Sequence, residues 1–503
     1  MNLVNEVRSI WSKSTTIKLA PVLAIIALMS WALASPVGSS PDDDFHLPSI
    51  WCAAGEKPNE CHVAADERRH EVREVLARKP CFAKSAEQSA ACLGTSLGDG
   101  KNTLVSTSKG NFHNLYPPVF YQTMNLFVSS NIALSVILMR IVNILLLVGL
   151  ATVLYVFLPS HRRLPLVWGL AISLVPLGLF MVASTNPSAW AIISAGTFWI
   201  SLLGYFESSG AKKAGLGAIA ALSAVLGAGA RADAAIYVLL AVVVVVLLTA
   251  HLTRRWLISA LLPFVLSVTA AVFYFSTQQS AVPISGLSGY TNPGGHVSWH
   301  YLLFTDLLNV PSLWAGVLGS WGLGWLDTNM PAIVWVGGVG CFAALAFAGL
   351  VSLSIRKALA VVIVLGALWL FPTYILVRSG AIVGIGVQPR YILPLVIMLA
   401  GVVLLQVSGV RLRLSRGQVV VLVSTLSVIN ATALYFNMQR YISGAGVTSW
   451  NFSAVVRWWW NIPVPPIVVW AAGSLSFAAF LVITARENLL TQPTDMPNQE
   501  VRQ

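Results

Sequence analysis

Apolar segments long enough to cross a bilayer recur along the whole of this sequence. A membrane-spanning helix needs about 20 mostly apolar residues. Of the 503 residues, 56% are hydrophobic and 10% are charged, whereas a soluble domain carries about 25% charged residues. We therefore predict an all-α integral membrane protein of about twelve spans with large extracytoplasmic loops. The predicted spans are 17–35, 133–158, 165–183, 188–206, 214–230, 234–250, 256–276, 331–353, 358–377, 391–409, 419–436 and 467–485.

Basic residues predict the orientation of these spans, because Lys and Arg in short loops mark the cytoplasmic side. Alternate short loops carry basic residues throughout, which predicts that both termini are cytoplasmic. The residues are Arg8, Lys13, Lys18, Arg162, Arg163, Lys212, Lys213, Arg254, Arg255, Arg356, Lys357, Arg411, Arg413, Arg416, Arg486 and Arg502. The net charge of +12 thus reports topology, and scattered basic residues argue against nucleic-acid binding. The first span, ending Ala32-Leu33-Ala34 after a basic start, also resembles a cleavable signal peptide, which stays an alternative.

The loops define the domain organisation and the side on which the protein works. We divide the chain into 1–35 (cytoplasmic tail and first span), 36–132 (large extracytoplasmic loop), 133–276 (spans two to seven), 277–330 (second extracytoplasmic loop), 331–485 (spans eight to twelve, with an external loop at 437–466) and 486–503 (cytoplasmic tail). Cytoplasmic loops are too short for a soluble catalytic domain. We therefore expect a multi-pass protein of a bacterial plasma membrane whose functional site lies on the extracytoplasmic face.

Four of the five cysteines fall in the first large loop, at Cys52, Cys61, Cys81 and Cys92. Cysteines gathered in one extracytoplasmic loop predict two disulfides in an oxidising compartment. The simplest of three pairings is 52–61 with 81–92. A zinc site is the alternative, although spacings of nine and eleven are unusual for zinc ligands.

Two further segments of the first loop have helical character. Ala65–Lys79 predicts a charged surface helix in which Glu74 and Arg78 form an i,i+4 pair. An apolar stretch beginning at Tyr116 predicts a helix lying at the membrane interface.

Three consecutive aspartates, Asp42, Asp43 and Asp44, directly follow the first span. A purely structural interpretation makes Ser40 a helix N-cap and the acids first-turn residues that the helix dipole favours. Three adjacent like charges repel one another, however. His46 shares a helical face with the first two acids, and such a set can act as a general base or bind a divalent metal.

The run Pro41-Asp42-Asp43-x-x-His46 resembles the Pro-Asp-Glu-x-x-His pattern of a bacterial membrane-protein family related to the GT-C superfamily, whose members use polyprenyl-phosphate-linked sugars. Three more runs look like features of that family: Tyr116-Pro117-Pro118, Asn186-Pro187-Ser188 and Gln388-Pro389-Arg390-Tyr391. Asp43 stands where the pattern often has Glu, which shortens its reach by one methylene.

The resemblance implies a GT-C-like inverting glycosyltransferase with a polyprenyl-phosphate sugar as donor and a cell-envelope glycan or lipid as acceptor. Asp42 is then the general base, with a pKa that we expect burial to raise. Asp43 and His46 orient the acceptor or bind a divalent cation, Mg²⁺ or Mn²⁺, beside the lipid phosphate.

Outward-side residues supply candidates for binding the rest of the substrate, since charges at membrane depth are costly and usually functional. Arg390 is the first candidate for the donor phosphate and Arg378 the second. Asp327 contacts the sugar or caps a turn. The other substrate-binding candidates are Tyr116 and Asn186, whereas Arg231 with Asp233 indicates a structural ion pair and Arg140 an interior side chain without a chemical role.

Other functions remain open at this point. A transporter or flippase of lipid-linked sugars predicts mid-span charges and two related halves, and only Arg140 is clearly mid-span. An envelope-polymer polymerase or ligase would depend on Arg378 and Arg390 more than on Asp42. A non-catalytic assembly partner would have no essential polar residue.

Overall fold

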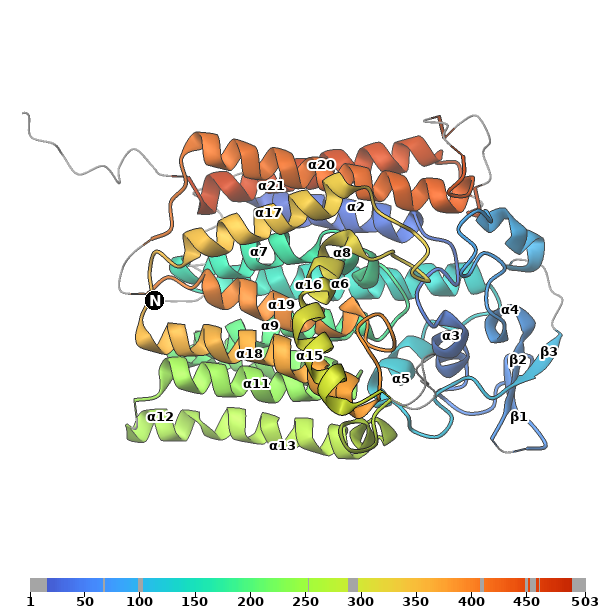
Figure 1. Ribbon diagram of the computed structural model, residues 1–503, viewed down its shortest axis with the longest axis horizontal. Helices are drawn as coiled ribbons and strands as arrows, with labels where there is room; N and C mark the ends of the chain where they lie inside the picture. The colour runs from blue at the N-terminus through green and yellow to red at the C-terminus, as the bar shows by residue number, and fades with distance from the viewer. Residues whose placement is uncertain are drawn as a thin grey trace, which may run out of the picture.

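The computed structural model describes residues 16–66, 68–97, 103–251, 253–287, 297–407, 411–447, 451–452, 458–460 and 462–490. Most of them form a bundle of long helices that run side by side, with the first loop gathered at one end of the bundle (Figure 1). The helices before α11 are η1 (Ile17–Leu19), α2 (Ala20–Leu33), α3 (Asp43–Trp51), α4 (Glu74–Ala77), η2 (Ala90–Leu97), α5 (Val119–Asn125), α6 (Ile132–Phe157), α7 (Ser160–Leu174), α8 (Leu177–Val182), α9 (Ser188–Glu207) and α10 (Gly210–Ala228). The later helices are α11 (Ala232–Thr249), α12 (Arg254–Ser259), α13 (Leu261–Phe275), η3 (Gln278–Ala281), α14 (Val282–Ser285), α15 (Trp299–Asn309), α16 (Pro311–Ala315), η4 (Gly316–Ser320), α17 (Ala332–Gly349), α18 (Ile355–Arg378), α19 (Pro389–Val403), α20 (Arg416–Ile442) and α21 (Pro466–Asn488).

Within the described residues, ten helices are long and apolar enough to cross a membrane, and Ile17–Leu33 and Pro389–Val403 are shorter apolar helices. The prediction of a multi-pass helical membrane protein is therefore confirmed, and nine of the twelve predicted spans match long helices. The predicted span 165–183 is wrong as a single helix. It breaks into α7 and α8 around Pro176, which has no backbone N–H to donate and whose ring disfavours helix in the residue before it.

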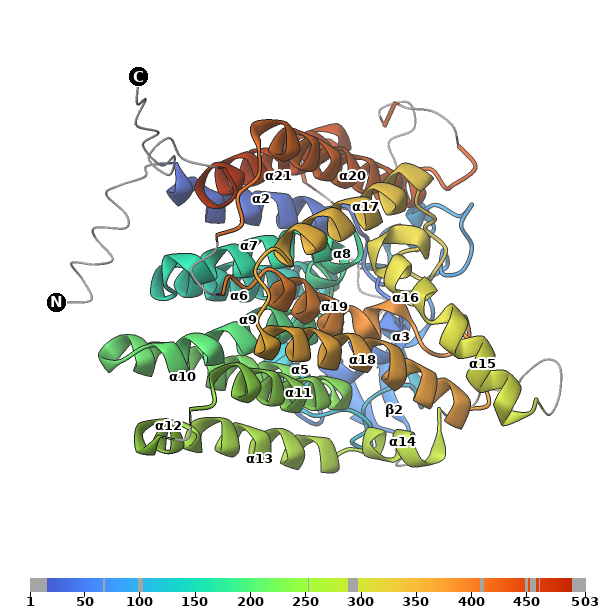
Figure 2. The same ribbon diagram turned by 60° about the vertical axis from the view of Figure 1, so that its left-hand side comes forward.

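A second difference concerns the predicted external loop at 277–330. Residues Trp299–Ser320 form a run that is long and apolar enough to count as a span. The run divides into α15, α16 and the π-turn η4, and α15 lies obliquely across the end of the bundle (Figure 2). Trp299, Tyr301 and Phe304 of α15 are exposed.

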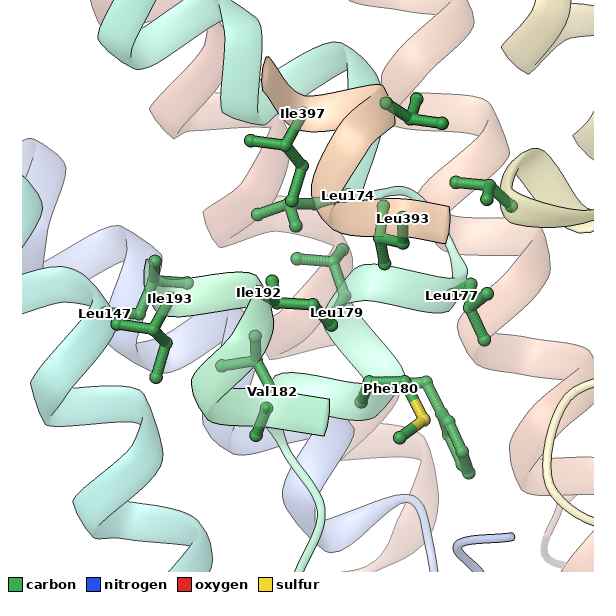
Figure 3. Close-up of a cluster of buried hydrophobic side chains, with 14 of the residues drawn as sticks. Leu147, Leu174, Leu177, Leu179, Phe180, Val182, Ile192, Ile193, Leu393 and Ile397 are labelled. Atoms are coloured by element: carbon green, nitrogen blue, oxygen red, sulfur yellow. The ribbon is translucent and has the colours of Figure 1, made fainter. Parts of the chain in front are cut away.

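Close helix crossings and a shared apolar core hold the bundle together. A Cβ added to Gly169 of α7 would lie 3.1 Å from the Cα of Gly401 of α19, so only small residues permit this approach. Leucine, isoleucine and phenylalanine side chains of α6, α8, α9 and α19 fill the centre (Figure 3). This packing fixes the broken pair α7–α8 against α9 and α19.

The basic loops meet at the end of the bundle opposite the first loop. Arg162, in the first turn of α7, donates to Glu207 at the end of α9 and to the carbonyl of Gln406 beyond α19, 3.0 Å away. Lys357, at the start of α18, donates to the carbonyl of Leu405 at 2.7 Å. Segments that the charge pattern assigns to one side of the membrane thus lie together.

The first loop folds as a small subdomain with strands as well as helices. Its antiparallel sheet has the order β1 (Cys61–Val63), β2 (His70–Arg73) and β3 (Leu104–Thr107). The prediction of one helix over Ala65–Lys79 is wrong, because His70–Arg73 pairs with both neighbouring strands and only the four residues of α4 remain helical.

Both predicted disulfides are confirmed, Cys52–Cys61 and Cys81–Cys92. The first joins the end of α3 to β1. The predicted Glu74–Arg78 ion pair is also present at 3.0 Å, on the exposed side of the loop. The helix predicted after Tyr116 exists as α5, but Phe120, Tyr121 and Met124 are buried in the protein rather than spread along a membrane surface.

Candidate functional site

The acidic run forms the beginning of α3, in a geometry that simple helix capping does not explain. Asp42 has left-handed backbone angles, φ 60° and ψ 24°, and its side chain makes no capping hydrogen bond. A non-glycine residue in this region carries strain of roughly 1–3 kcal/mol, and such residues cluster at functional sites. The expected N-cap role of Ser40 is wrong: its backbone N–H donates to Asp43 at 3.1 Å, and its hydroxyl has no partner.

The left-handed turn presents Asp42 to Arg390 at the start of α19, and the two form an ion pair. The Arg390 side chain is 3% exposed and that of Asp42 is 49% exposed, so the carboxylate is accessible and the guanidinium is buried. Arg390 Nη2 also donates to the hydroxyl of Tyr391 at 3.0 Å. Its Nε and Nη1 have no hydrogen-bond partner, which is costly for a buried guanidinium and characteristic of a site that receives an anion.

The pKa of Asp42 differs from our expectation. Burial raises the pKa of this carboxyl, but the charge of Arg390 and its hydrogen bond, together with His46 and Arg231, bring the net pKa below the usual range. Asp42 is therefore a carboxylate at neutral pH. The expectation of a raised pKa considered burial alone. It is wrong because Arg390 pairs with Asp42, and the sequence did not show that contact.

Asp43 and Asp44 point to different partners. Asp43 is 1% exposed and accepts hydrogen bonds from the Thr185 hydroxyl and the Ser40 N–H, both at 3.1 Å. Burial raises its pKa to about 7, although Arg140 and the two hydrogen bonds oppose the rise. Asp44 pairs with Lys109 of the first loop. Of the three acids, Asp42 alone pairs with Arg390.

His46 belongs to an aromatic cluster. Its Nδ1 lies 2.9 Å from the Tyr121 hydroxyl, and its ring contacts Phe45 and Tyr116 edge-on. Burial lowers the pKa of this imidazole to about 3, even though Asp42 opposes the shift, so it stays neutral.

The predicted cation ligands Asp43 and His46 make their hydrogen bonds to different neighbours. In the part of the chain that the structure describes, no three His, Cys, Asp or Glu residues lie close enough together to hold a metal ion. Asp43 and His46 therefore do not form a ligand set for a divalent cation. The binding of Mg²⁺ or Mn²⁺ stays a prediction that this arrangement does not support.

Arg231, which the sequence suggested only as a structural ion pair, lies beside this centre. It does pair with Asp233, through hydrogen bonds of 2.9 and 2.8 Å. Its guanidinium carbon also lies 5.6 Å from the ring centre of Tyr116 and 4.9 Å from that of Tyr391. Tyr391 thus contacts both arginines, since Arg390 lies 5.0 Å from the same ring.

A cavity of about 390 Å³ is lined by Arg231 and by Tyr391, the ring that Arg390 also contacts; Arg390 itself is not among the lining residues. Arg231, Asp233 and Tyr116 form its polar end. The remaining wall is mostly apolar and aromatic and comes from α11, α13, α14, α18 and α19. These wall residues include Ile236, Tyr274, Val282, Phe371, Ile375 and Ile392. A polar end joined to an apolar chamber suits an amphipathic ligand.

The other predicted site residues are placed as follows. Tyr116 lines the cavity, whereas Asn186 supports the site by donating to the carbonyl of Pro41 at 2.9 Å. Arg378, at the end of α18, donates to the carbonyl of Ile284 and is not among the charges that act on Asp42. Asp327 forms a buried ion pair with Arg440 at 2.9 Å.

Sequence reasoning underweighted Arg231 and Tyr391. The available signal was the charged residue directly before the apolar run of α11, which is costly at membrane depth. Nothing in the sequence showed that α11 and α19 begin side by side, so the sharing of the Tyr391 ring by two arginines was not predictable.

Comparison with known proteins adds one assignment. No curated protein matches the chain. The family model described as a predicted membrane protein, DUF2142, matches residues 25–399. That range contains α3, both arginines and the cavity described above. Because the match covers most of the sequence, the chain belongs to the DUF2142 family of predicted membrane proteins.

Proposed function

We propose that this protein is a membrane glycosyltransferase of the GT-C type that transfers a sugar from a polyprenyl-phosphate donor to a cell-envelope glycan or lipid. The observation that carries the proposal is the Asp42–Arg390 pair. An accessible carboxylate lies against a buried guanidinium with two unpaired nitrogens, and the adjacent Tyr391 lines a cavity of about 390 Å³. A base and a phosphate-binding cation in contact are the two groups that displacement at a sugar–phosphate bond requires.

Arg390 is the proposed binding group for the donor phosphate. A guanidinium offers a planar fork of donors that matches phosphate oxygens. Nη2 already donates to Asp42 and Tyr391, so Nε and Nη1 would each donate a separate hydrogen bond to a phosphate oxygen. As the sugar–phosphate bond breaks, negative charge grows on the phosphate, and a buried cation stabilises it more strongly than water would.

Asp42 is the proposed general base. The acceptor hydroxyl gives its proton to the Asp42 carboxylate while its oxygen forms the new bond to the anomeric carbon. The bond from that carbon to the phosphate oxygen breaks, and polyprenyl phosphate leaves with the electron pair. A single displacement of this kind inverts the anomeric configuration.

Donor binding would also increase the basicity of Asp42. In the structure described, Arg390 holds the pKa of this carboxyl below its usual range. A phosphate on the same guanidinium shares that positive charge, and its own negative charge disfavours a neighbouring carboxylate. The pKa of Asp42 therefore rises when the donor is bound, as a base needs.

The cavity is the proposed place of the lipid. Its apolar wall accepts the first isoprenoid units, and Arg231 at the polar end, which also contacts Tyr391, attracts the phosphate. No step of this mechanism uses a metal ion, since Asp43 and His46 do not form a suitable ligand set.

The membrane orientation is part of the same proposal. The basic loops lie at one end of the bundle and the Asp42 centre at the other, which supports a site outside and both termini inside a bacterial plasma membrane. Two disulfides in the subdomain beside the site support an oxidising compartment.

The test is transfer of labelled sugar from a panel of polyprenyl-phosphate donors by purified protein in lipid nanodiscs. We expect Asp42→Asn to lower turnover by about 10²–10⁴-fold, as for loss of a general base. Asp44→Asn is the matched control, because this neighbouring carboxylate pairs with Lys109 and not with Arg390. A parallel sample with chelator tests the cation.

Equal turnover in wild type and Asp42→Asn would refute the assignment of the base. Absence of turnover with every donor, in folded protein, would favour a transporter of lipid-linked sugars. Loss of turnover in Arg390→Gln and Arg378→Gln, with Asp42→Asn active, would favour a polymerase or ligase.

A further inference from the structure

A second cavity, of about 160 Å³, lies between α2, α6, α7 and α21. The lining on η1 and α2 extends from Ile17 to Leu28, and on α6 from Leu147 to Val156. Since α6 ends just before the basic loop at Arg162, one end of the cavity lies at the basic end of the bundle. It is therefore separate from the Asp42 centre.

The lining of this slot is almost entirely hydrocarbon. Small residues, among them Ala24 and Ala151, leave the space, and Phe477 and Phe480 of α21 close one side. Apolar cavities of about 150 Å³ stay dry and accept apolar ligands. The slot is thus suited to a hydrocarbon chain and not to water or to a polar metabolite.

The depth of the slot matches one leaflet of a bilayer. Lys18 and Leu28 both line it and are ten residues apart on one helical segment, which corresponds to about 15 Å at 1.5 Å per residue. The hydrocarbon core of a bilayer is about 30 Å thick. At the end of the slot nearer the middle of the bundle, the lining includes Leu147, Leu174 and Leu179 of the buried cluster in Figure 3.

Two basic residues, Lys18 and Arg163, and the acidic Glu487 lie near the end of the slot at the basic end of the bundle. Lys18 and Tyr155 line it there. The guanidinium carbon of Arg163 lies 4.8 Å from the ring centre of Tyr155, and its Nε is buried with no hydrogen-bond partner among the described residues. An acyl chain in the slot would place its phosphate at this level, where an arginine with a free donor complements a negative charge.

We propose that this slot binds one anionic phospholipid from the leaflet at the basic end of the bundle. One acyl chain occupies the space between α2, α6, α7 and α21, and the phosphate contacts Arg163 and Lys18. The proposal does not depend on the glycosyltransferase assignment.

Native mass spectrometry of the detergent-purified full-length protein tests the proposal, with phosphatidylglycerol and phosphatidylcholine of identical chains added. We expect one phosphatidylglycerol to bind at least tenfold more tightly than phosphatidylcholine. Ala151→Trp, which fills the slot, should abolish binding. Val153→Trp is the control, because Val153 lies on the same helix but is 42% exposed on its outer side. Arg163→Gln should remove most of the preference for phosphatidylglycerol.

A photoreactive acyl chain on phosphatidylglycerol gives a second readout that needs no substitution in the core. Crosslinks to peptides from α2, α6 and α7 are expected. Unchanged lipid binding by Ala151→Trp, or crosslinks confined to other helices, would overturn the proposal. Binding that appears only after residues 1–14 are removed would also overturn it, by showing that the chain's own N-terminal segment competes for the slot.

Discussion

Asp327 was predicted to contact the sugar or to cap a turn, and its buried pair with Arg440 predicts a different role. Arg440 Nη2 donates to Asp327 at 2.9 Å and to the carbonyls of Phe82 and Ser85 at 2.7 and 3.0 Å. Asp327 accepts a second hydrogen bond from the backbone N–H of Lys84, 3.0 Å away. The pair therefore fastens the Cys81–Cys92 loop to the end of α20.

We predict that Asp327→Asn detaches this loop. The two side chains are only 9% and 2% exposed, and removing one partner of a buried ion pair costs about 3–5 kcal/mol. Because Arg440 keeps its carbonyl partners, we expect a value near the lower limit, about 3 kcal/mol. At about 1.4 kcal/mol per factor of ten, this corresponds to a roughly 100-fold larger population of the detached loop.

Tryptic cleavage after Lys84 measures that population, because Lys84 is exposed and cleavage tracks the equilibrium opening when reclosing is fast. The expected result is cleavage about 100-fold faster in Asp327→Asn than in wild type. Asp66→Asn, at an exposed carboxylate outside the Cys81–Cys92 loop, should leave the rate unchanged. If Asp327→Asn is cleaved at the wild-type rate and its KM for the sugar donor is raised, the structural role is refuted and a sugar contact is favoured.

Three further predictions concern pH and the disulfides. Because Arg390 keeps the pKa of Asp42 below its usual range, kcat/KM should stay constant through weakly acidic pH and fall only below about 4. In Arg390→Gln the burial of Asp42 remains without the opposing charge, so the fall of kcat/KM in acid should move to higher pH. Burial raises the pKa of Asp43 to about 7, so the folded state pays free energy to charge a carboxyl that ionises near pH 4 in the unfolded chain. Asp43→Asn should therefore stabilise the fold in thermal unfolding, by an amount that grows as pH rises from about 4 and levels off above about 7. A gain that is constant with pH would contradict this cause. Replacing Cys52 and Cys61 by Ser should lower the free energy of unfolding by about 2–3 kcal/mol, as expected for a short disulfide loop. An unchanged midpoint of thermal unfolding would contradict that estimate.

Much of the membrane architecture is determined by composition along the chain. Apolar runs near 20 residues have few stable alternatives to helices in a bilayer, so α6, α9, α11 and α21 were predictable from local hydropathy. The disulfide pairing was predictable for a similar reason, because each bond joins neighbouring cysteines within one loop.

Local sequence failed where a segment depends on distant partners. His70–Arg73 has helical character in isolation, but pairing with β1 and β3 makes it a strand. The division between α7 and α8 was visible in Pro176, yet the mean hydropathy of the stretch concealed it.

For the candidate site, the sequence alone determined that Asp42 and Arg390 are polar residues beside spans, where charge is expensive and calls for a purpose. Their contact joins positions 348 residues apart, and no local pattern encodes that separation. Only the tertiary fold, which brings the turn before α3 to the start of α19, decided which acid is exposed, which is buried, and what sets each pKa. Ionisation depends on desolvation and on neighbouring charge, and both are properties of the assembled fold rather than of the chain.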